Sequence, residues 1–181
     1  MRVIVTGVPG VGKSSVMEGV AKAQRLPIVN YGSVMFEQAK AAGLAASRDD
    51  MRKLPADVQR EVQAEAGRRI GAMADAIIDT HCLIKTAEGY LPGIPMGVLS
   101  LIAPQVVVLV EAPPGEIHGR RAKDASRSRD DDSVASIEEH QQMNRAAAAA
   151  MGVISGATVK VVPNLDGGLE EAVRRFNEIF R

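Results

Sequence analysis

The segment GVPGVGKS at residues 7–14 constrains the fold of this chain more than any other feature. It fills every fixed position of the pattern G-x-x-x-x-G-K-[ST], which describes a phosphate-binding loop, or P-loop. A run rich in β-branched side chains, residues 2–6, precedes the segment, and residues 13–24 have helical spacing. Because a P-loop joins a strand to the start of a helix, this context predicts a nucleotide-binding fold.

Each part of the loop has a predicted role in holding phosphate. Glycines at positions 7, 10 and 12 allow positive φ and let the backbone approach a ligand closely. Successive N–H groups then converge on phosphate oxygens at the positive end of the helix. Lys13 can reach the β- and γ-phosphates, and the Ser14 hydroxyl is expected to bind Mg²⁺. Alternatively, the segment binds no phosphate and is a glycine-rich turn with an exposed lysine.

Short runs rich in β-branched residues alternate with helical segments along the whole chain. The runs are continuously apolar, which is typical of strands buried on both faces of a parallel sheet. Strands that alternate with helices predict an α/β fold of the doubly wound type. The predicted strands are residues 2–6, 27–31, 76–80, 105–111 and 158–163, and the predicted helices are residues 13–24, 56–75, 136–154 and 169–180.

A carboxylate follows the third predicted strand. Asp79 ends the apolar run IID, and a P-loop fold places there the acidic residue that orients Mg²⁺ or its water ligands. An ordinary aspartate at a strand end is the alternative. His81 follows two residues later, but a single histidine without clustered partners favours a polar or structural role over metal binding.

The charge balance argues against general nucleic-acid binding, although it leaves room for a local basic patch. The chain has 22 Lys and Arg residues against 22 Asp and Glu residues, and polyanion affinity needs a surplus of cations. Aromatic residues make up only 3% and Trp is absent, so a base-stacking platform is difficult to build.

Cys82 is the only cysteine, which excludes an internal disulfide and a cysteine-rich structural zinc site. No apolar stretch approaches the roughly 20 residues of a membrane-spanning helix. The apolar start of the chain meets Gly7, Pro9 and Lys13 before the core of a signal peptide could form. We therefore expect a cytoplasmic protein with no membrane partner.

Two segments interrupt the alternation of strands and helices, and cations cluster around both. Residues 32–54 separate the second strand from a long helix, and residues 120–132 are dense in charge. A phosphate acceptor is already an oxyanion, so it needs cations to offset charge repulsion rather than a protein base. Alternatively, both segments are surface loops whose charged side chains are only solvated. The cations are Arg48, Arg52, Lys53 and Lys85 in the first group, and Arg120, Arg121, Lys123, Arg127 and Arg129 in the second.

These features together resemble the adenylate kinases, and more narrowly the archaeal type. The most specific segments are DTHCLIKTAEGYLPGIP at residues 79–95 and EEHQQMNRAAA at residues 138–148. GVPGVGKSS at 7–15, NYGSVMF at 30–36, RDDMRKL at 48–54 and RSRD at 127–130 also contribute. The segment GATV at 156–159 resembles the late loop that lies beside the donor adenine in that family.

The resemblance implies a P-loop fold with a five-stranded parallel sheet and helices on both faces. It also implies an AMP-binding insertion at about residues 31–75, a short lid at about 120–132, and Mg²⁺-dependent phosphoryl transfer from ATP to AMP that gives two ADP. Lys13, Arg121, Arg127 and Arg129 would be catalytic, with Arg120 and Arg145 as further candidates. Donor phosphates would bind Gly7, Val8, Pro9, Gly10, Val11, Gly12, Lys13, Ser14 and Ser15, AMP would bind Gly32, Arg52, Lys85 and Leu91, and Mg²⁺ would contact Ser14 and, through water, Asp79.

The chain departs from the bacterial pattern at the acceptor side. Phe36 stands at the spacing of an arginine, so Arg52 is expected to supply that charge, and Ser33 stands where Asp is common. Archaeal members are often trimers. Two alternatives stay open at this point: a kinase for a different nucleoside monophosphate, and an RNA-associated P-loop NTPase or switch.

The P-loop assignment predicts the effect of removing its lysine. Lys13→Ala should lower kcat by roughly a hundredfold or more, because the ammonium serves donor binding and transition-state charge at once. Steady-state kinetics of the variant measure this. A variant that keeps half of the activity would contradict the assignment.

Overall fold

The computed structural model describes residues 1–123 and 133–181. Its strands are β1 (Arg2–Thr6), β2 (Ile28–Asn30), β3 (Ala76–Asp79), β4 (Leu83–Thr86), β5 (Gly89–Pro92), β6 (Val106–Glu111) and β7 (Thr158–Pro163). Its helices are α1 (Lys13–Gln24), α2 (Tyr31–Ala41), α3 (Arg48–Arg52), α4 (Ala56–Gly71), α5 (Met96–Ile102), α6 (Pro114–Lys123), α7 (Val134–Ser155) and α8 (Leu169–Asn177), and a 3₁₀ turn covers Glu178–Phe180.

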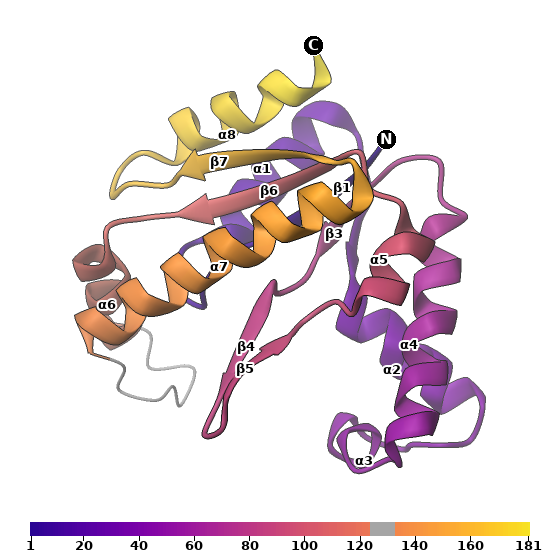
Figure 1. Ribbon diagram of the computed structural model, residues 1–181. Helices are drawn as coiled ribbons and strands as arrows, with labels where there is room; N and C mark the ends of the chain where they lie inside the picture. The colour runs from indigo at the N-terminus through magenta and orange to yellow at the C-terminus, as the bar shows by residue number, and fades with distance from the viewer. Residues whose placement is uncertain (124–132) are drawn as a thin grey trace.

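Five strands form one parallel sheet in the order β2-β3-β1-β6-β7. In the register, Val5 of β1 lies beside Asp79 of β3 on one side and beside Val108 of β6 on the other. All five strands therefore end at the same edge of the sheet, and the P-loop follows β1 at that edge. The strands β4 and β5 form a separate antiparallel hairpin (Figure 1).

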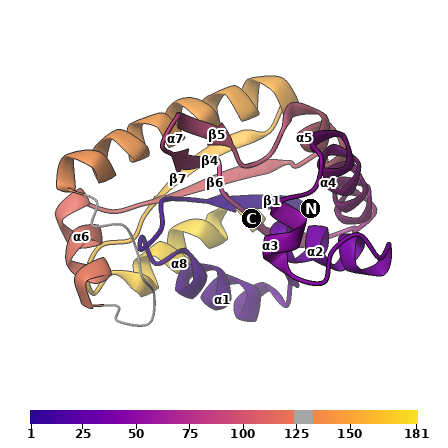
Figure 2. The same ribbon diagram turned by 90° about the horizontal axis from the view of Figure 1, so that it is seen from below.

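Helices cover both faces of the sheet, and each face buries its own apolar cluster. Figure 2 shows α1 and α8 on one face and α5 and α7 on the other. Val5, Val16 and Phe176 are among the fully buried residues on the first face, and Ile4 and Leu109 on the second. Alternate side chains of β1 thus enter different clusters, as the pleat of a strand requires.

Local signals fix the ends of the long helix α7. The side chain of Ser133 accepts the N–H of Ser136 at 3.2 Å, which satisfies one of the free donors of the first turn. At the other end Gly156 has φ 73° and donates its N–H to Gly152 O at 2.9 Å. A glycine in the left-handed conformation is a common way to end a helix.

The five predicted strands and the predicted α/β class are confirmed, and the predicted helices form with small shifts of their ends. The expectation that all strands are buried on both faces is wrong for β2 and β7. Each pairs on one side only, and Ile28 and Val161 are 39% and 44% exposed. The hairpin and the helices α2, α3, α5 and α6 were not predicted.

The two segments that interrupt the alternation have different structures. Residues 31–75 fold into α2, α3 and α4 between β2 and β3. The predicted lid begins inside a helix, because Arg120 and Arg121 belong to the last turn of α6. Its residues 124–132 lie outside the described part of the chain. Within residues 1–123 and 133–181, no helix is both long and apolar enough to cross a membrane.

Candidate functional site

The P-loop has the backbone geometry that its glycines predict. Gly10 and Gly12 both have φ 85°, which L side chains rarely adopt. At Gly7 a Cβ atom would lie 2.6 Å from the carbonyl oxygen of Val110, so the loop packs closely on β6. Among the described residues, no side chain caps the start of α1 at Gly12. The first N–H groups of this helix therefore remain available for an anion.

Lys13 is held at the end of β3. Its Nζ donates to the carbonyl oxygen of Thr80 at 2.6 Å and makes an ion pair with Asp79. The side chains of Lys13 and Asp79 are only 12% and 20% exposed, so water screens the pair weakly. The other carboxylate oxygen of Asp79 accepts from the Asn30 side chain at 2.8 Å. The structure thus brings together Lys13 and Asp79, a contact that the sequence analysis did not predict.

A second set of contacts holds the outer side of the P-loop at Val11. Its carbonyl oxygen accepts from Asn164 Nδ2 at 2.8 Å and from Arg120 Nη1 at 3.2 Å. Arg120 also makes ion pairs with Glu116 and Asp166. The guanidinium of Arg120 therefore joins α6, the P-loop and the segment after β7.

Arg121 reaches the P-loop from the same helix turn. Its Nε donates to the carbonyl oxygen of Pro9 at 2.8 Å. Of the predicted lid arginines, Arg121 is therefore brought to the donor loop. Arg127 and Arg129 lie outside the described residues.

Arg48 at the start of α3 lies beside Gly32 at the start of α2. This pair is on the other side of Asp79 from Lys13. Asn30 caps this helix and accepts the N–H of Ser33 at 2.9 Å. Arg48 Nη2 donates to Ser33 Oγ at 2.8 Å, and the guanidinium carbon lies 5.9 Å from the centre of the Phe36 ring. A Cβ atom at Gly32 would lie 3.6 Å from Arg48 Nη1. The Arg48 guanidinium therefore lies beside Phe36, the position at which the bacterial pattern has an arginine.

The other predicted acceptor residues lie on different elements. Arg52 ends α3 and pairs with Asp49 at 3.0 Å, and both side chains are about three-quarters exposed. Lys85 of β4 donates to Ser136 Oγ at the start of α7, and Leu91 of β5 is 57% exposed. The described contacts bring Arg48, rather than Arg52, to Gly32. The four predicted residues therefore do not form one cluster in this structure.

Known proteins are similar to this chain over most of its length. A family model described as an AAA domain matches residues 6–138. The adenylate kinase of Methanopyrus kandleri is 53% identical over 185 residues, which cover 99% of this chain and 97% of the relative. The adenylate kinase of Thermoplasma volcanium is 52% identical over 172 residues, which cover 95% of each chain. The chain belongs to the adenylate kinase family. It is an enzyme with adenylate kinase function, as the resemblance predicted.

Solved structures support the fold of this adenylate kinase. Shikimate kinase from Bacteroides thetaiotaomicron superimposes with a TM-score of 0.57 at 15% identity, over 99% of this chain and 98% of that chain. A gluconokinase from Sinorhizobium meliloti 1021 gives 0.53 at 16% identity, over 96% and 87%. At this identity the likeness concerns the fold alone, and it confirms the predicted P-loop kinase architecture.

A magnesium ion fits the residues at the end of β3 and the start of α1. Mg²⁺ prefers hard oxygen ligands and retains several waters. Ser14, an exposed residue, offers a hydroxyl, and Asp79 offers the carboxylate oxygen Oδ1, whose contact among the described residues is the ion pair with Lys13. Elsewhere in the described ranges, no three His, Cys, Asp or Glu side chains gather as a metal site.

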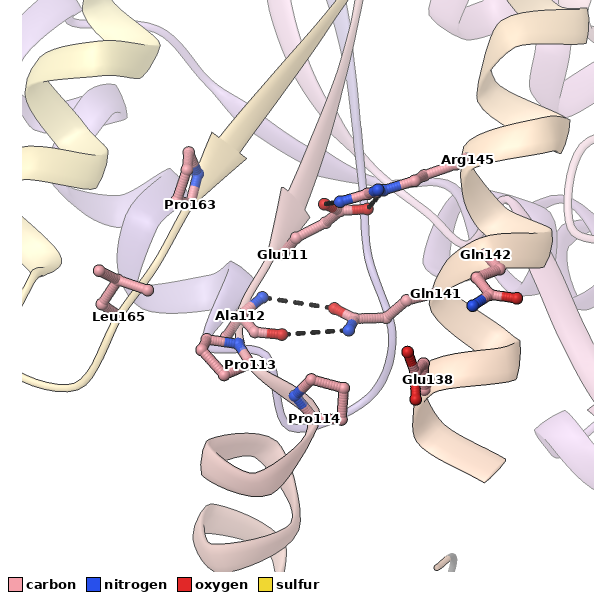
Figure 3. Close-up of a pocket in the computed structure, with 10 residues that line it drawn as sticks. All are labelled: Glu111, Ala112, Pro113, Pro114, Glu138, Gln141, Gln142, Arg145, Pro163 and Leu165. Carbon is pink, nitrogen blue, oxygen red and sulfur yellow. Dashed lines mark hydrogen bonds and ion pairs between the residues drawn. The ribbon is translucent and has the colours of Figure 1, made fainter. Parts of the chain in front are cut away.

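A cavity of about 350 Å³ lies between α7 and the ends of β6 and β7. Figure 3 shows that three of its polar side chains, those of Gln141, Arg145 and Glu111, already have partners within the protein. The amide of Gln141 bonds to the backbone of Ala112 at 3.0 and 3.3 Å, and Arg145 makes two hydrogen bonds to Glu111. These bonds raise the pKa of Arg145. Arg145, a further lid candidate from the sequence, therefore fastens α7 to β6.

The expected position of the late loop is wrong. Residues 156–159 lead into β7, whose Thr158 pairs with Val106 at the start of β6. In a parallel sheet all strands begin at one edge and end at the other. Residues 156–159 therefore lie at the edge where the strands begin, and the P-loop lies at the edge where they end. The segment that does reach the P-loop follows β7 and begins with Asn164. A single polar residue after an apolar run was the only sequence signal for it.

Proposed function

We propose that ATP binds at the P-loop and AMP binds beside Gly32, so that the γ-phosphoryl group passes in line between them and two ADP form. The support is a continuous series of contacts between the two sites. Lys13 pairs with Asp79, and Asp79 accepts from Asn30. Asn30 also accepts from Ser33, which in turn accepts from Arg48. These contacts hold the P-loop and the start of α2 at one edge of the sheet, which supports placing donor and acceptor side by side there.

The reaction in this proposal needs positioned cations and no protein base. The attacking group is a phosphate oxygen that is already negative, so charge repulsion is the main obstacle. Lys13 and Arg121 stand at the donor loop, and we assign the same catalytic role to Arg127 and Arg129. Closure of residues 120–132 over the phosphates would exclude water and prevent hydrolysis of ATP.

Magnesium enters this proposal with ATP. Ser14 and, through water, Asp79 would hold it, and it would neutralise charge on the transferred phosphates when bound. Backbone N–H groups of residues 7–15 would hold the remaining donor oxygens. Lys85 and Leu91 of the hairpin stay our proposed contacts to the phosphate and base of AMP.

Dependence of ATP turnover on AMP tests the proposed reaction directly. A coupled assay should detect ADP formation from ATP and Mg²⁺ only when AMP is added, with two ADP formed per ATP consumed. CMP, UMP and GMP serve as controls for the acceptor. Turnover that is independent of AMP and stimulated by RNA would contradict the proposal, and turnover greater with another monophosphate would reassign the acceptor.

The acceptor side gives a second prediction, in which Arg48 replaces Arg52 as the phosphate-binding cation. Arg48→Ala should raise the KM for AMP about tenfold or more, because a charge-assisted hydrogen bond to phosphate is lost. Arg52→Ala is the matched control on the same short helix and should change this KM by less than about twofold. The KM for ATP should stay unchanged in both. A raised AMP KM in Arg52→Ala alone would restore the assignment made from the sequence.

We further propose that the chain is cytoplasmic and assembles as a trimer. The location is supported by the single, buried Cys82, which has no cysteine to pair with in the chain. The number three comes from the family resemblance, and an interface between copies is supported by apolar side chains on the end of α7 and on β7: Val153 is 87% exposed, Ile154 51% and Val161 44%. Light scattering should give three times the chain mass of 19.2 kDa, and a monomer mass would contradict the assembly.

A further inference from the structure

The P-loop peptide between Val11 and Gly12 is fixed from outside the loop. Its carbonyl oxygen accepts from the side-chain amide of Asn164 at 2.8 Å, and more weakly from Arg120 at 3.2 Å. Asn164 is 7% exposed and lies directly after β7. More than 150 residues of sequence separate the two groups, so the fold brings them together.

The direction of a carbonyl determines the direction of the next N–H group. A trans peptide is planar, and its C=O and N–H point to opposite sides. Since the Val11 carbonyl points outward to Asn164, the N–H of Gly12 points to the inner side of the loop. That inner side, at the uncapped start of α1, is where the donor phosphates are proposed to bind.

We propose that Asn164 is a positioning residue that presets the P-loop for the donor nucleotide. It acts through the Val11–Gly12 peptide and does not itself contact the phosphates. The inference rests on the proposed donor-binding role of the P-loop. Orienting the N–H groups before the ligand arrives removes a reorganisation step from binding and from the transition state.

The fit between Asn164 and Gly12 supports this role. A Cβ atom on residue 12 would lie 2.3 Å from Asn164 Nδ2, far inside normal contact. The amide therefore occupies the space that a side chain at this position would need. Gly12 is required here for its φ of 85° and also for the approach of Asn164.

Asn164 is itself held rigidly by two neighbouring elements. Its backbone N–H donates to Glu111 O at 2.7 Å, which extends the pairing of β7 with β6. Its backbone carbonyl accepts from Arg120 Nη2 at 2.9 Å, and Arg120 is fixed by its ion pairs with Glu116 and Asp166. The amide can therefore hold the loop without a large loss of side-chain freedom.

Substitution of the amide separates positioning from general stability. Asn164→Leu keeps a similar volume but removes the donor, and Asn164→Asp keeps the shape but sets a carboxylate oxygen against the Val11 carbonyl. Gln105→Leu is the control, because Gln105 also bonds two backbone groups, of Arg2 and Ala103, but at the other edge of the sheet. Calorimetric binding of ATP and of AMP, steady-state kinetics and thermal melting are measured for each variant.

We expect both Asn164 variants to bind ATP about tenfold more weakly and to lose kcat, with Asn164→Asp the more affected. AMP binding should change by less than about twofold, and Gln105→Leu should alter only the melting temperature. Unchanged ATP affinity in folded Asn164→Asp, or an equal loss for ATP and AMP, would overturn the positioning role. If the wild-type chain bound no ATP, the proposed donor site itself would fail, which is a distinguishable result.

Discussion

The ion pair between Lys13 and Asp79 is the interaction on which the arrangement of the site depends. It joins the P-loop after β1 to the end of β3, two strands that are neighbours in the sheet. Both groups are mostly removed from water, so each needs the other to offset the cost of burial. Asp79 also accepts from Asn30 at the end of β2. Three parallel strand ends thereby present their polar groups in one row.

This row explains how one sheet edge can serve two nucleotides. The proposed donor side lies where α1 begins with no side-chain cap from the described residues, and the proposed acceptor side lies where Asn30 caps α2. The contacts on Val11 and Pro9 from Asn164, Arg120 and Arg121 hold the far side of the donor loop. The loop is thus supported from both sides, and its inner N–H groups are left for phosphate. Catalysis by positioning requires such support, because small displacements of charged groups reduce the rate strongly.

The sequence predicts the strand, glycine loop and helix of the P-loop well because the motif is local. Strand, glycines, lysine and helix follow one another within 24 residues, and Asp79 is marked by the apolar run before it. The acceptor side depends on tertiary packing. Arg48 and Arg52 are a single helical turn apart on α3, which begins after Ser47, and Arg48 is the one that reaches Ser33. The Ser47–Asp50 capping box was a sequence signal for this start.

Long-range contacts account for the remaining differences. Asn164 and the β4–β5 hairpin are defined by what they meet in space. The motif at residues 79–95 marks the family, but it does not predict that the hairpin contacts α7.

A crystal structure with two adenosines joined by five phosphates would test the two-site arrangement most directly. The account predicts one adenosine on the donor side, phosphates between the P-loop N–H groups and Lys13, and the acceptor phosphate within hydrogen-bond distance of Arg48 beside Gly32. An acceptor phosphate that binds elsewhere, or a phosphate chain that leaves the Gly12 N–H unbound, would contradict it.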